Sequence, residues 1–281
     1  MNDRSHAGTE RTPEQIRQQY EVEKELSNRL RLATRAERRT LYATVYDELF
    51  TRVLDHPQLT RKASPEEKER AVQAQMCFLR PFLGPDVTFL EVGAGDCALS
   101  LEAAALTRQV YAVDVSDEIT RNLAAPPNFR LVMSDGCSIP VPPGSANVAY
   151  SNQLMEHLHP DDAREQLQNL YASLAPGGVY CCVTPNRLSG PHDVSRGFDE
   201  VATGFHLKEY IITDLAQLFT QVGFSEIKVH YRVGRKYVGV PVTWLRPVEW
   251  ALARLPTGLR RAISHTRLFR SLLTIRLSGR K

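Results

Sequence analysis

The sequence predicts an α/β fold in which a mostly parallel sheet carries helices on both faces. Three observations support this prediction: short apolar runs alternate with helix-like segments, a glycine-rich turn follows the first run, and the second run ends in an acid. Strands that alternate with helices form parallel sheets, which bind ligands at the carboxyl ends of their strands. The apolar runs occupy residues 89–92, 110–113, 129–133, 146–151 and 179–184.

Helix-like segments lie before, between and after these runs. Ser64-Pro65-Glu66-Glu67 is a strong helix start, because a serine caps the first turn and acids favour its positive end. Residues 225–233 alternate in polarity and residues 236–242 follow a glycine, which predicts a closing antiparallel pair. The remaining helices are expected at 13–37, 41–54, 98–107, 160–174 and 207–222.

The turn Gly93-Ala94-Gly95 after the first run predicts a nucleotide-type pocket. Glycine has no Cβ, so the backbone can approach a ligand closely. Asp114, which ends the second run, can accept hydrogen bonds from both ribose hydroxyls. The third glycine of a dinucleotide fingerprint is missing, and Glu91 before the turn would repel a pyrophosphate. The pattern therefore favours a cationic ligand such as S-adenosylmethionine (SAM), which joins adenosine to a sulfonium and an amino-acid tail.

Further motifs extend the pattern over residues 78–231. Asp135-Gly136 follows the third run, Glu156-His157-Leu158 the fourth, and Leu174-Ala175-Pro176-Gly177-Gly178 precedes the fifth. With the glycine turn and Asp114, the chain resembles the class I SAM-dependent methyltransferases, in particular their type 11/type 12 branch. The resemblance implies a Rossmann-like sheet of parallel strands plus a C-terminal antiparallel pair. The chain departs at Cys97, where many members have Gly, and at Asn147, where many have Asp.

The resemblance also implies a set of cofactor contacts. The glycine turn passes beneath the SAM amino-acid moiety, and Glu91 orients its ammonium group. Asp114 holds the ribose hydroxyls, and Asp135 accepts a hydrogen bond from the adenine amino group, although a turn-capping role for Asp135 remains open. The expected cofactor-binding residues are Glu91, Gly93, Ala94, Gly95, Asp114, Val115, Asp135, Gly136, Asn152 and Gln153.

Glu156, His157 and His206 are the candidate catalytic residues. If the chain turns helically there, Gln153, Glu156 and His157 share one face at the mouth of the pocket. Some related RNA 2′-O- and ubiquinone-pathway O-methyltransferases hold a divalent metal with Glu-x-x-Glu-His and, in the former, a later His. Here Gln153 replaces the first Glu, which weakens such a site. We expect no metal; capping or lining the pocket, general-base action by a histidine, and metal binding all remain open.

Composition restricts the class of protein. The 281 residues, 42% of them hydrophobic, suffice for one domain of this type with additions. No run of 18 apolar residues predicts a transmembrane helix, and the polar start has no signal-peptide core. The five cysteines show neither zinc nor disulfide spacing, which fits a reducing cytoplasm.

Three regions are expected along the chain. Residues 1–80 form a helical cap, residues 81–242 the SAM-binding domain, and residues 243–281 basic amphipathic helices. An apolar stripe on 41–54 either packs on the sheet or forms a lid in which Tyr42 or Tyr46 reaches the cofactor. The 186–206 loop lies at the ligand end of the sheet and is the candidate for substrate recognition.

The C-terminal segment is strongly basic. Residues 232–281 hold twelve Lys/Arg and one acid, a net charge of +11, which leaves 23 basic and 31 acidic residues (−8) elsewhere. Apolar residues recur through 259–277 beside arginines, which predicts a basic amphipathic helix, and both tryptophans, Trp244 and Trp250, precede it. Packing on the domain, binding to an anionic membrane surface and binding to nucleic acid are all open.

These patterns predict a SAM-dependent methyltransferase that methylates an oxygen of a small-molecule, glycan or lipid-linked acceptor, because no nucleic-acid module is evident. The alternatives are a catalytically idle SAM-fold scaffold and an RNA-directed enzyme that uses the basic tail. The expected location is the cytoplasm, with peripheral membrane contact as an option. The sequence leaves open the acceptor, the choice among O-, N- and C-methylation, and the oligomeric state.

Overall fold

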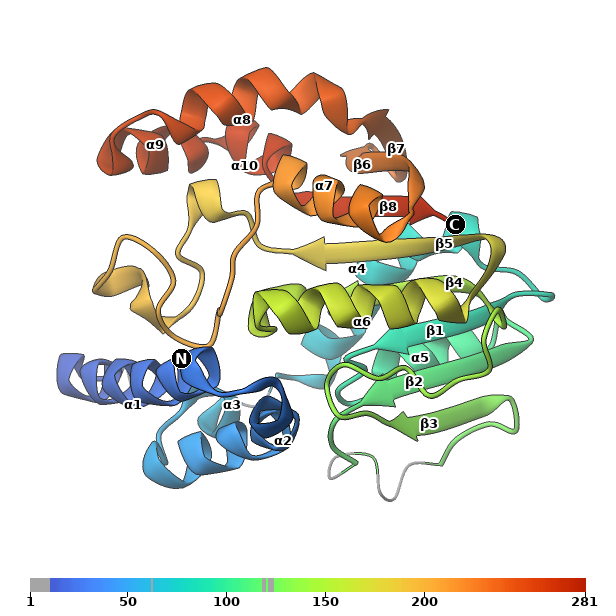
Figure 1. Ribbon diagram of the computed structural model, residues 1–281, viewed down its shortest axis with the longest axis horizontal. Coiled ribbons are helices and arrows are strands. Elements are labelled where there is room, and N and C mark those ends of the chain that lie inside the picture. Colours follow the sequence, from blue (N-terminus) through green and yellow to red (C-terminus); the bar gives the residue numbers. More distant parts are fainter. Residues whose placement is uncertain (1–10, 62, 118–119, 121–123) are drawn as a thin grey trace, which may run out of the picture.

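The structure is a computed structural model that describes residues 11–61, 63–117, 120 and 124–281. Its described residues form an eight-stranded sheet in the order β3-β2-β1-β4-β5-β8-β6-β7 (Figure 1). Strands β1 to β5 are parallel, β8 runs antiparallel between β5 and β6, and β7 pairs antiparallel with β6. The predicted parallel sheet with closing antiparallel strands is therefore confirmed. The strands are β1 Thr88–Val92, β2 Gln109–Asp114, β3 Phe129–Met133, β4 Ala146–Asn152, β5 Leu174–Thr184, β6 Ser225–Val233, β7 Lys236–Pro241 and β8 Ile275–Arg280.

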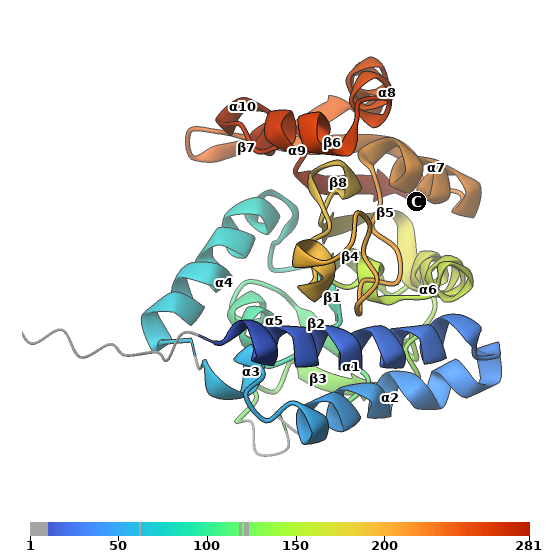
Figure 2. The same ribbon diagram turned by 90° about the vertical axis from the view of Figure 1, so that its left-hand side faces the viewer.

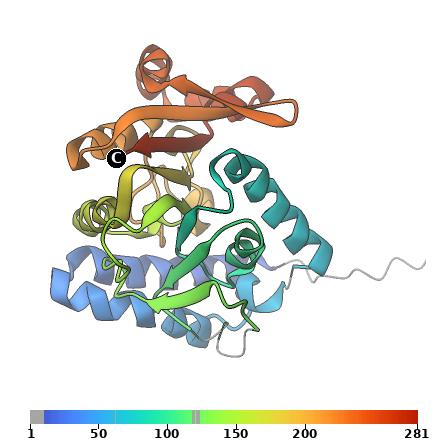
Figure 3. The same cartoon turned by 90° about the vertical axis from the view of Figure 1, so that its right-hand side faces the viewer.

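Helices cover both faces of the sheet, and Figure 3 shows the strands between them. Helices α4 and α5 pack on one face, and α6 and α7 on the other. Successive strand residues point to opposite faces. Cys181 therefore lies in the core beneath α4 and α5, and Cys182 in the core beneath α6 and α7. Burial on both faces explains why the strands read as continuous apolar runs. These helices are α4 Pro65–Leu79, α5 Ala98–Ala104, α6 Pro160–Ser173 and α7 Ile212–Val222.

Two N-terminal helices, α1 (Pro13–Leu32) and α2 (Arg35–Arg52), lie side by side beyond the carboxyl ends of the parallel strands (Figures 1 and 2). Each begins with a capping box. The side chain of Thr12 or Thr34 accepts a hydrogen bond from the backbone N–H three residues later, and the side chain of that later residue accepts one from the threonine N–H. Helices are present in much of the region 12–80 that was predicted as a cap, but only α1 and α2 lie over the strand ends, because α4 packs on a face of the sheet. Residues 1–10 lie outside the described part.

A buried ion pair joins this cap to α6. Arg38 donates from Nε and Nη2 to the two carboxylate oxygens of Asp162, at 2.5 and 2.7 Å, and Tyr42 Oη donates to the same carboxylate at 2.7 Å. Burial alone would raise the pKa of Asp162, but the bonds from Arg38 and Tyr42 outweigh it and hold that pKa below its usual range. Such bidentate, charge-assisted pairs fix both distance and orientation.

The C-terminal segment differs from its prediction. The single amphipathic helix expected over 259–277 is wrong: α9 (Thr257–Ser264) and α10 (Arg267–Leu272) are short, and the chain then forms β8. Apolar residues four apart fit a helix face or a strand equally well over so short a span. Pairing decides for the strand, because β8 fills the gap between β5 and β6.

The boundary expected at residue 242 therefore does not separate a tail from the domain. After β7, the edge strand of the sheet, helices α8 to α10 (the inserted helices) form an excursion that returns to the sheet at β8. No helix among the described residues is long and apolar enough to cross a bilayer. The remaining helices are α3 Pro57–Thr60, η1 Arg80–Phe82, η2 Met155–His157, η3 Arg187–Ser189, η4 Val194–Gly197, η5 Val242–Leu245 and α8 Arg246–Ala253.

Breaking the buried ion pair is expected to loosen the cap. Arg38→Ala leaves the buried Asp162 carboxylate without its cation, which costs about 3–5 kcal/mol of unfolding free energy. The control, Arg35→Ala, removes an exposed partner of Glu165 and costs about 0–1 kcal/mol. Denaturant unfolding at pH 7 measures both variants. The wild-type advantage should shrink as pH falls through the lowered pKa of Asp162, and equal stability of the two variants would contradict the pairing.

Variants at two leucines of the C-terminal segment test whether it contains a core strand or forms a free tail. Leu277→Ala, in the middle of β8 and 0% exposed, should cost about 2–5 kcal/mol of stability through lost burial and a residual cavity. Leu268→Ala, on α10 and 72% exposed, should change stability by no more than about 0.5 kcal/mol. Thermal and denaturant unfolding give both values. A neutral effect of Leu277→Ala would mean that β8 is not part of the folded sheet.

Candidate functional site

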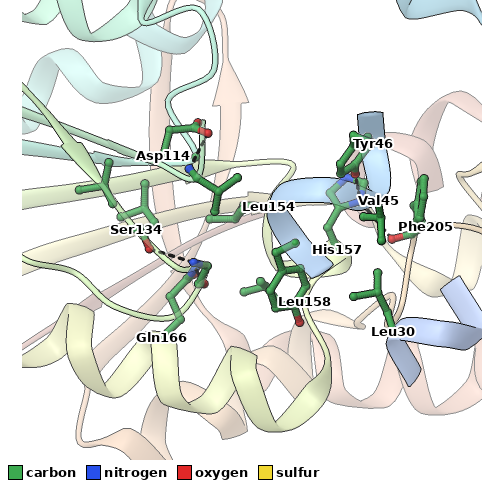
Figure 4. A pocket seen from close by; sticks show the side chains of 16 residues that line it. Leu30, Val45, Tyr46, Asp114, Ser134, Leu154, His157, Leu158, Gln166 and Phe205 are labelled. Atoms are coloured by element: carbon green, nitrogen blue, oxygen red, sulfur yellow. Dashed lines mark hydrogen bonds between the residues drawn. The ribbon is translucent and has the colours of Figure 1, made fainter. Parts of the chain in front are cut away.

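The main cavity lies where the cap meets the carboxyl ends of the strands. The ends of β1, β2 and β3 and the segment after β4 form its floor, while α1 and α2 close it from the other side (Figure 4). Its lining is largely apolar, with a few polar groups at one edge. The lining residues are Leu30, Tyr42, Val45, Tyr46, Val92, Gly93, Val113, Asp114, Val115, Ser134, Gly136, Leu154, His157, Leu158, Gln166 and Phe205.

The glycine turn adopts a backbone conformation that favours glycine. Gly93 and Gly95 have φ of 75° and 53°, in the left-handed region that favours glycine. A Cβ on Gly93 would lie 3.2 Å from Leu154 Cδ1, so glycine also keeps the floor of the cavity open. Cys97, which departs from the family pattern, also has positive φ (58°) and precedes α5. The backbone thus retains a conformation that suits glycine there, with a buried thiol in its place.

Asp114 is held rigidly at the end of β2. Its Oδ2 accepts from the Gly95 N–H at 2.7 Å, and its Oδ1 accepts from the N–H groups of Val115 and Ser116 at 2.7 and 3.2 Å. The carboxylate also lines the cavity, and each of its oxygens can accept more than one bond. The predicted ribose acceptor is therefore oriented by backbone groups.

Glu91 lies below the turn and outside the cavity lining. Its Oε2 accepts from Ser100 Oγ at 2.6 Å, and burial, helped by the charges of Asp96 and Asp114, raises the pKa of Glu91 to about 8. A nearby cation would stabilise the ionised form of this carboxyl, because it offsets the cost of holding a charge in a buried place. The predicted contact with an ammonium group stays a prediction.

Tyr42 and Tyr46 both line the cavity, which favours the lid over simple packing on the sheet. A Cβ on Gly136 would lie 2.8 Å from the ring carbon Cδ2 of Tyr42, so only glycine fits beneath this ring. Gln166 on α6 donates to the Gly136 carbonyl at 2.7 Å and fixes the same loop. Sequence reasoning did not single out Gln166, because a polar residue within a helix carries no local signal of a role.

Four of the ten predicted cofactor residues line the cavity: Gly93, Asp114, Val115 and Gly136. Asp135 caps its own turn, with Oδ1 accepting from the Cys137 and Ser138 N–H groups, and faces Arg39. These contacts outweigh burial and lower the pKa of Asp135. They correspond to the turn-capping alternative.

Glu91, Ala94 and Gly95 lie in or beneath the turn, and Asn152 and Gln153 lie at the end of β4. Gln153 is exposed and has φ of 53°, so it stands outside the helical turn that begins at Met155. The helical face expected to join it to Glu156 and His157 is not formed.

The structure brings together the three predicted catalytic residues, although 48 or more residues separate His206 from the other two. The rings of His157 and His206 lie edge to face with centroids 5.0 Å apart, and potential ligand atoms of Glu156 and both histidines lie within 4.8 Å of one another. Burial raises the pKa of Glu156. Burial also lowers the pKa of His157 to about 4, helped by the charge of His206.

One residue beside this cluster escaped sequence reasoning. Glu209 Oε1 lies 2.7 Å from Nδ1 of His206 and also accepts from the His192 N–H at 2.6 Å. Burial alone would lower the pKa of His206, but Glu209 and the nearby carboxylates outweigh it and raise that pKa. The spacing of three residues between His206 and Glu209 was the available signal.

The predicted substrate loop borders a second cavity. Residues of the loop, of the segment 206–209 and of the inserted helices line it, among them Arg187, His206, Lys208 and Arg260. His206 thus stands in the wall of the second cavity, and its neighbour His157 in the wall of the first. The three-residue cluster lies at the junction of the two.

Comparison with known proteins agrees with this geometry. Residues 89–178 match the model of the methyltransferase domain family. A "Probable S-adenosylmethionine-dependent methyltransferase" of Mycolicibacterium smegmatis is 29% identical over 143 residues, which cover 50% of this chain and 52% of the relative. One from Mycobacterium tuberculosis H37Rv is 28% identical over 139 residues, 49% of this chain and 48% of the relative. The chain thus spans about half the length of these curated relatives.

Solved structures share the fold at low sequence identity. The YcgJ protein of Bacillus subtilis superposes with a TM-score of 0.50 at 14% identity, covering 75% of this chain and 98% of that one. Phosphoethanolamine N-methyltransferase 2 of Haemonchus contortus, solved with S-adenosylhomocysteine, also gives 0.50, at 15% identity over 74% of this chain and 52% of that one. The family match, the strand order and the glycine turn agree: residues 89–178 match a methyltransferase domain, and the described sheet shares the fold of these solved structures.

Proposed function

We propose that this protein is a SAM-dependent methyltransferase that methylates an oxygen of a small-molecule, glycan or lipid-linked acceptor. The observation that carries the proposal is Asp114, aimed at the cavity by the N–H groups of Gly95, Val115 and Ser116 at the end of β2. The domain match over 89–178 supports SAM as the cofactor. SAM, when bound, supplies a methyl group activated by a sulfonium.

The residues of the cavity fit such a ligand. The glycine turn offers close approach to an amino-acid moiety, Asp114 suits ribose hydroxyls, and the apolar lining suits an adenine ring. Tyr42 and Tyr46 from the cap close the cavity toward solvent. The chain's main contribution would be to position the acceptor in line with the methyl group and to exclude water.

Oxygen is the proposed acceptor atom because of the cluster beside the cavity. A hydroxyl must lose its proton as its oxygen forms the new bond to carbon. Glu156, His157 and His206 gather where both cavities meet and could assist that loss. An idle scaffold would need no such cluster at the cofactor cavity.

SAM binding tests the proposal directly. Wild-type protein is expected to bind SAM and S-adenosylhomocysteine with micromolar affinity, about −8 kcal/mol. Asp114→Ala should weaken binding strongly, because it removes the ribose acceptor. The control, Asp47→Ala, changes an exposed acid on α2 and should bind normally. Calorimetry gives the affinities, and absence of heat with either ligand in the wild-type protein would refute the proposal.

Transfer of a labelled methyl group extends the same test. Wild-type protein and tritiated SAM, incubated with metabolite and lipid extracts, should label a product that Asp114→Ala fails to label. SAM binding without any labelled product would favour the scaffold, and label confined to RNA would favour the RNA-directed alternative.

We further propose cytoplasmic location with reversible contact to anionic membranes. The support is the +11 charge of residues 232–281, together with Trp244 and Trp250, which are 70% and 60% exposed. Basic residues near an anionic surface contribute about 1 kcal/mol each, and tryptophan suits the interface. The five unpaired cysteines accord with the cytoplasm.

Vesicle flotation tests this contact without disturbing the sheet. Deletion of the segment is unsuitable because it removes β8, so the test uses Trp244→Ala/Trp250→Ala in the full chain. This variant should lose binding to anionic vesicles, while the control Leu32→Ala/Leu54→Ala, at exposed positions outside the segment, should retain it. Wild-type binding should weaken with salt. Equally poor flotation with neutral and anionic vesicles would end the membrane proposal.

A further inference from the structure

We propose that Glu156, His157 and His206 bind one divalent transition-metal ion at the junction of the two cavities. The proposal deepens the proposed function, on which its catalytic meaning rests, but ion binding can be measured without any methyl transfer. It also departs from the sequence-based expectation of no metal.

The first observation is an unsatisfied carboxylate. Glu156 is 0% exposed, its Oε2 accepts from Thr184 Oγ1 at 2.8 Å, and its Oε1 is buried without a hydrogen-bond partner. A buried carboxylate with a free oxygen is costly unless a cation compensates it. A potential ligand atom of each of the two imidazole rings lies within 4.8 Å of one from this carboxylate. The carboxylate oxygen that has no protein partner is available to an ion.

The second observation is how the two rings are held. Nδ1 of His206 lies 2.7 Å from the Glu209 carboxylate, and Nδ1 of His157 lies 3.1 Å from the Phe205 carbonyl. Nε2 of neither ring has a hydrogen bond among the described residues. Metal-binding histidines show this arrangement, in which an acceptor on one nitrogen fixes the tautomer and directs the lone pair of the other nitrogen to the ion.

The ligand set indicates the class of ion. Two imidazole nitrogens and one carboxylate suit first-row transition ions such as Mn²⁺, Fe²⁺ or Zn²⁺, whereas Mg²⁺ and Ca²⁺ prefer oxygen ligands. Gln153, exposed and turned away from the helical segment, does not complete the set. Three protein ligands leave positions open for a ligand from outside the protein.

A second group of candidate ligands shows the contrast. Cys137, Asp162 and Glu165 also lie close enough to hold an ion. Both oxygens of Asp162, however, are taken by Arg38, and Tyr42 donates to one of them. That carboxylate already has its cation, so the group carries no metal proposal.

The position of the cluster assigns a role to the ion. His157 stands in the wall of the cofactor cavity and His206 in the wall of the cavity under the substrate loop. An acceptor hydroxyl on an open metal position would lose its proton to water more readily. Its oxygen would then bond the methyl carbon as the bond from that carbon to sulfur breaks, which leaves a neutral thioether.

Ion binding is tested on tag-free full-length protein stripped with a chelator. Calorimetry with Zn²⁺ and electron paramagnetic resonance with Mn²⁺ should each detect one ion per chain. Glu156→Gln and His206→Asn should weaken binding more than about tenfold, and Glu209→Gln, which only disturbs the orientation of His206, by about 10–100-fold. The controls Glu102→Gln and His265→Asn, outside the cluster, should bind as the wild type does. Thermal unfolding identifies any variant that fails to fold. If Glu156→Gln or His206→Asn fails to fold, the ion affinity of Glu209→Gln decides whether the cluster binds the ion.

The outcomes separate this proposal from the proposed function. No binding of either ion by wild-type protein up to about 1 mM would overturn the metal site, as would equal binding by wild type and all three cluster variants. Ion binding without SAM binding would support the metal site and refute the methyltransferase. Methyl transfer that a chelator leaves unchanged would overturn the catalytic role of the ion, whereas loss of transfer restored by Mn²⁺ or Zn²⁺ would support it.

Discussion

The buried pair of Arg38 and Asp162 is the contact on which the closed cavity depends. It joins the cap to α6 across 124 residues of sequence, and Tyr42 shares the same carboxylate. Through Tyr42 the pair also sets the roof of the cavity, because this ring lies against Gly136. This charge-assisted interaction and the buried apolar side chains of α1 and α2 together hold the cap over the strand ends.

A second buried acid organises the opposite side of the site. Glu249, on α8 and 1% exposed, accepts from the N–H groups of Ile212 and Thr213 at 2.8 and 2.9 Å, and thereby caps the start of α7. An acid at a helix N-terminus is stabilised by the free N–H groups and the helix dipole. Arg261 on α9 donates to the carbonyls of Gly190 and Asp199 in the substrate loop. The inserted helices and the substrate loop therefore stabilise each other's position.

The charges around the site differ by cavity. The cofactor cavity is mainly apolar, with Asp114 as its fixed carboxylate, while arginines and lysine share the second cavity with acids. Glu156, His157 and His206 stand between them in a buried setting, where electrostatic interactions are strong and unpaired groups are costly. Because of this location, the same three residues are proposed both for the methyl transfer and for the ion.

The sequence alone determined the strands β1 to β7 and the floor of the cofactor cavity. Apolar runs of strand length predicted β1 to β5, and the antiparallel pair β6 and β7 followed from alternation and a glycine turn. The glycine turn and Asp114 predicted the cavity floor. These features are local: burial on both faces makes a strand apolar along its whole length, and positive φ at a turn position favours glycine. A short window of sequence therefore carries them.

Tertiary structure alone decided which distant groups meet. Residues 275–280 form a strand because they pair with β5 on one side and with β6 on the other. No local sequence pattern shows that these two strands are available for pairing. The same holds for Arg38 with Asp162 and for His206 with His157, since a charged or polar residue carries no mark of its partner. Asp135 turned inward to cap its own loop, and Gln153 turned outward, because backbone conformation directs a side chain more strongly than the motif in which it stands.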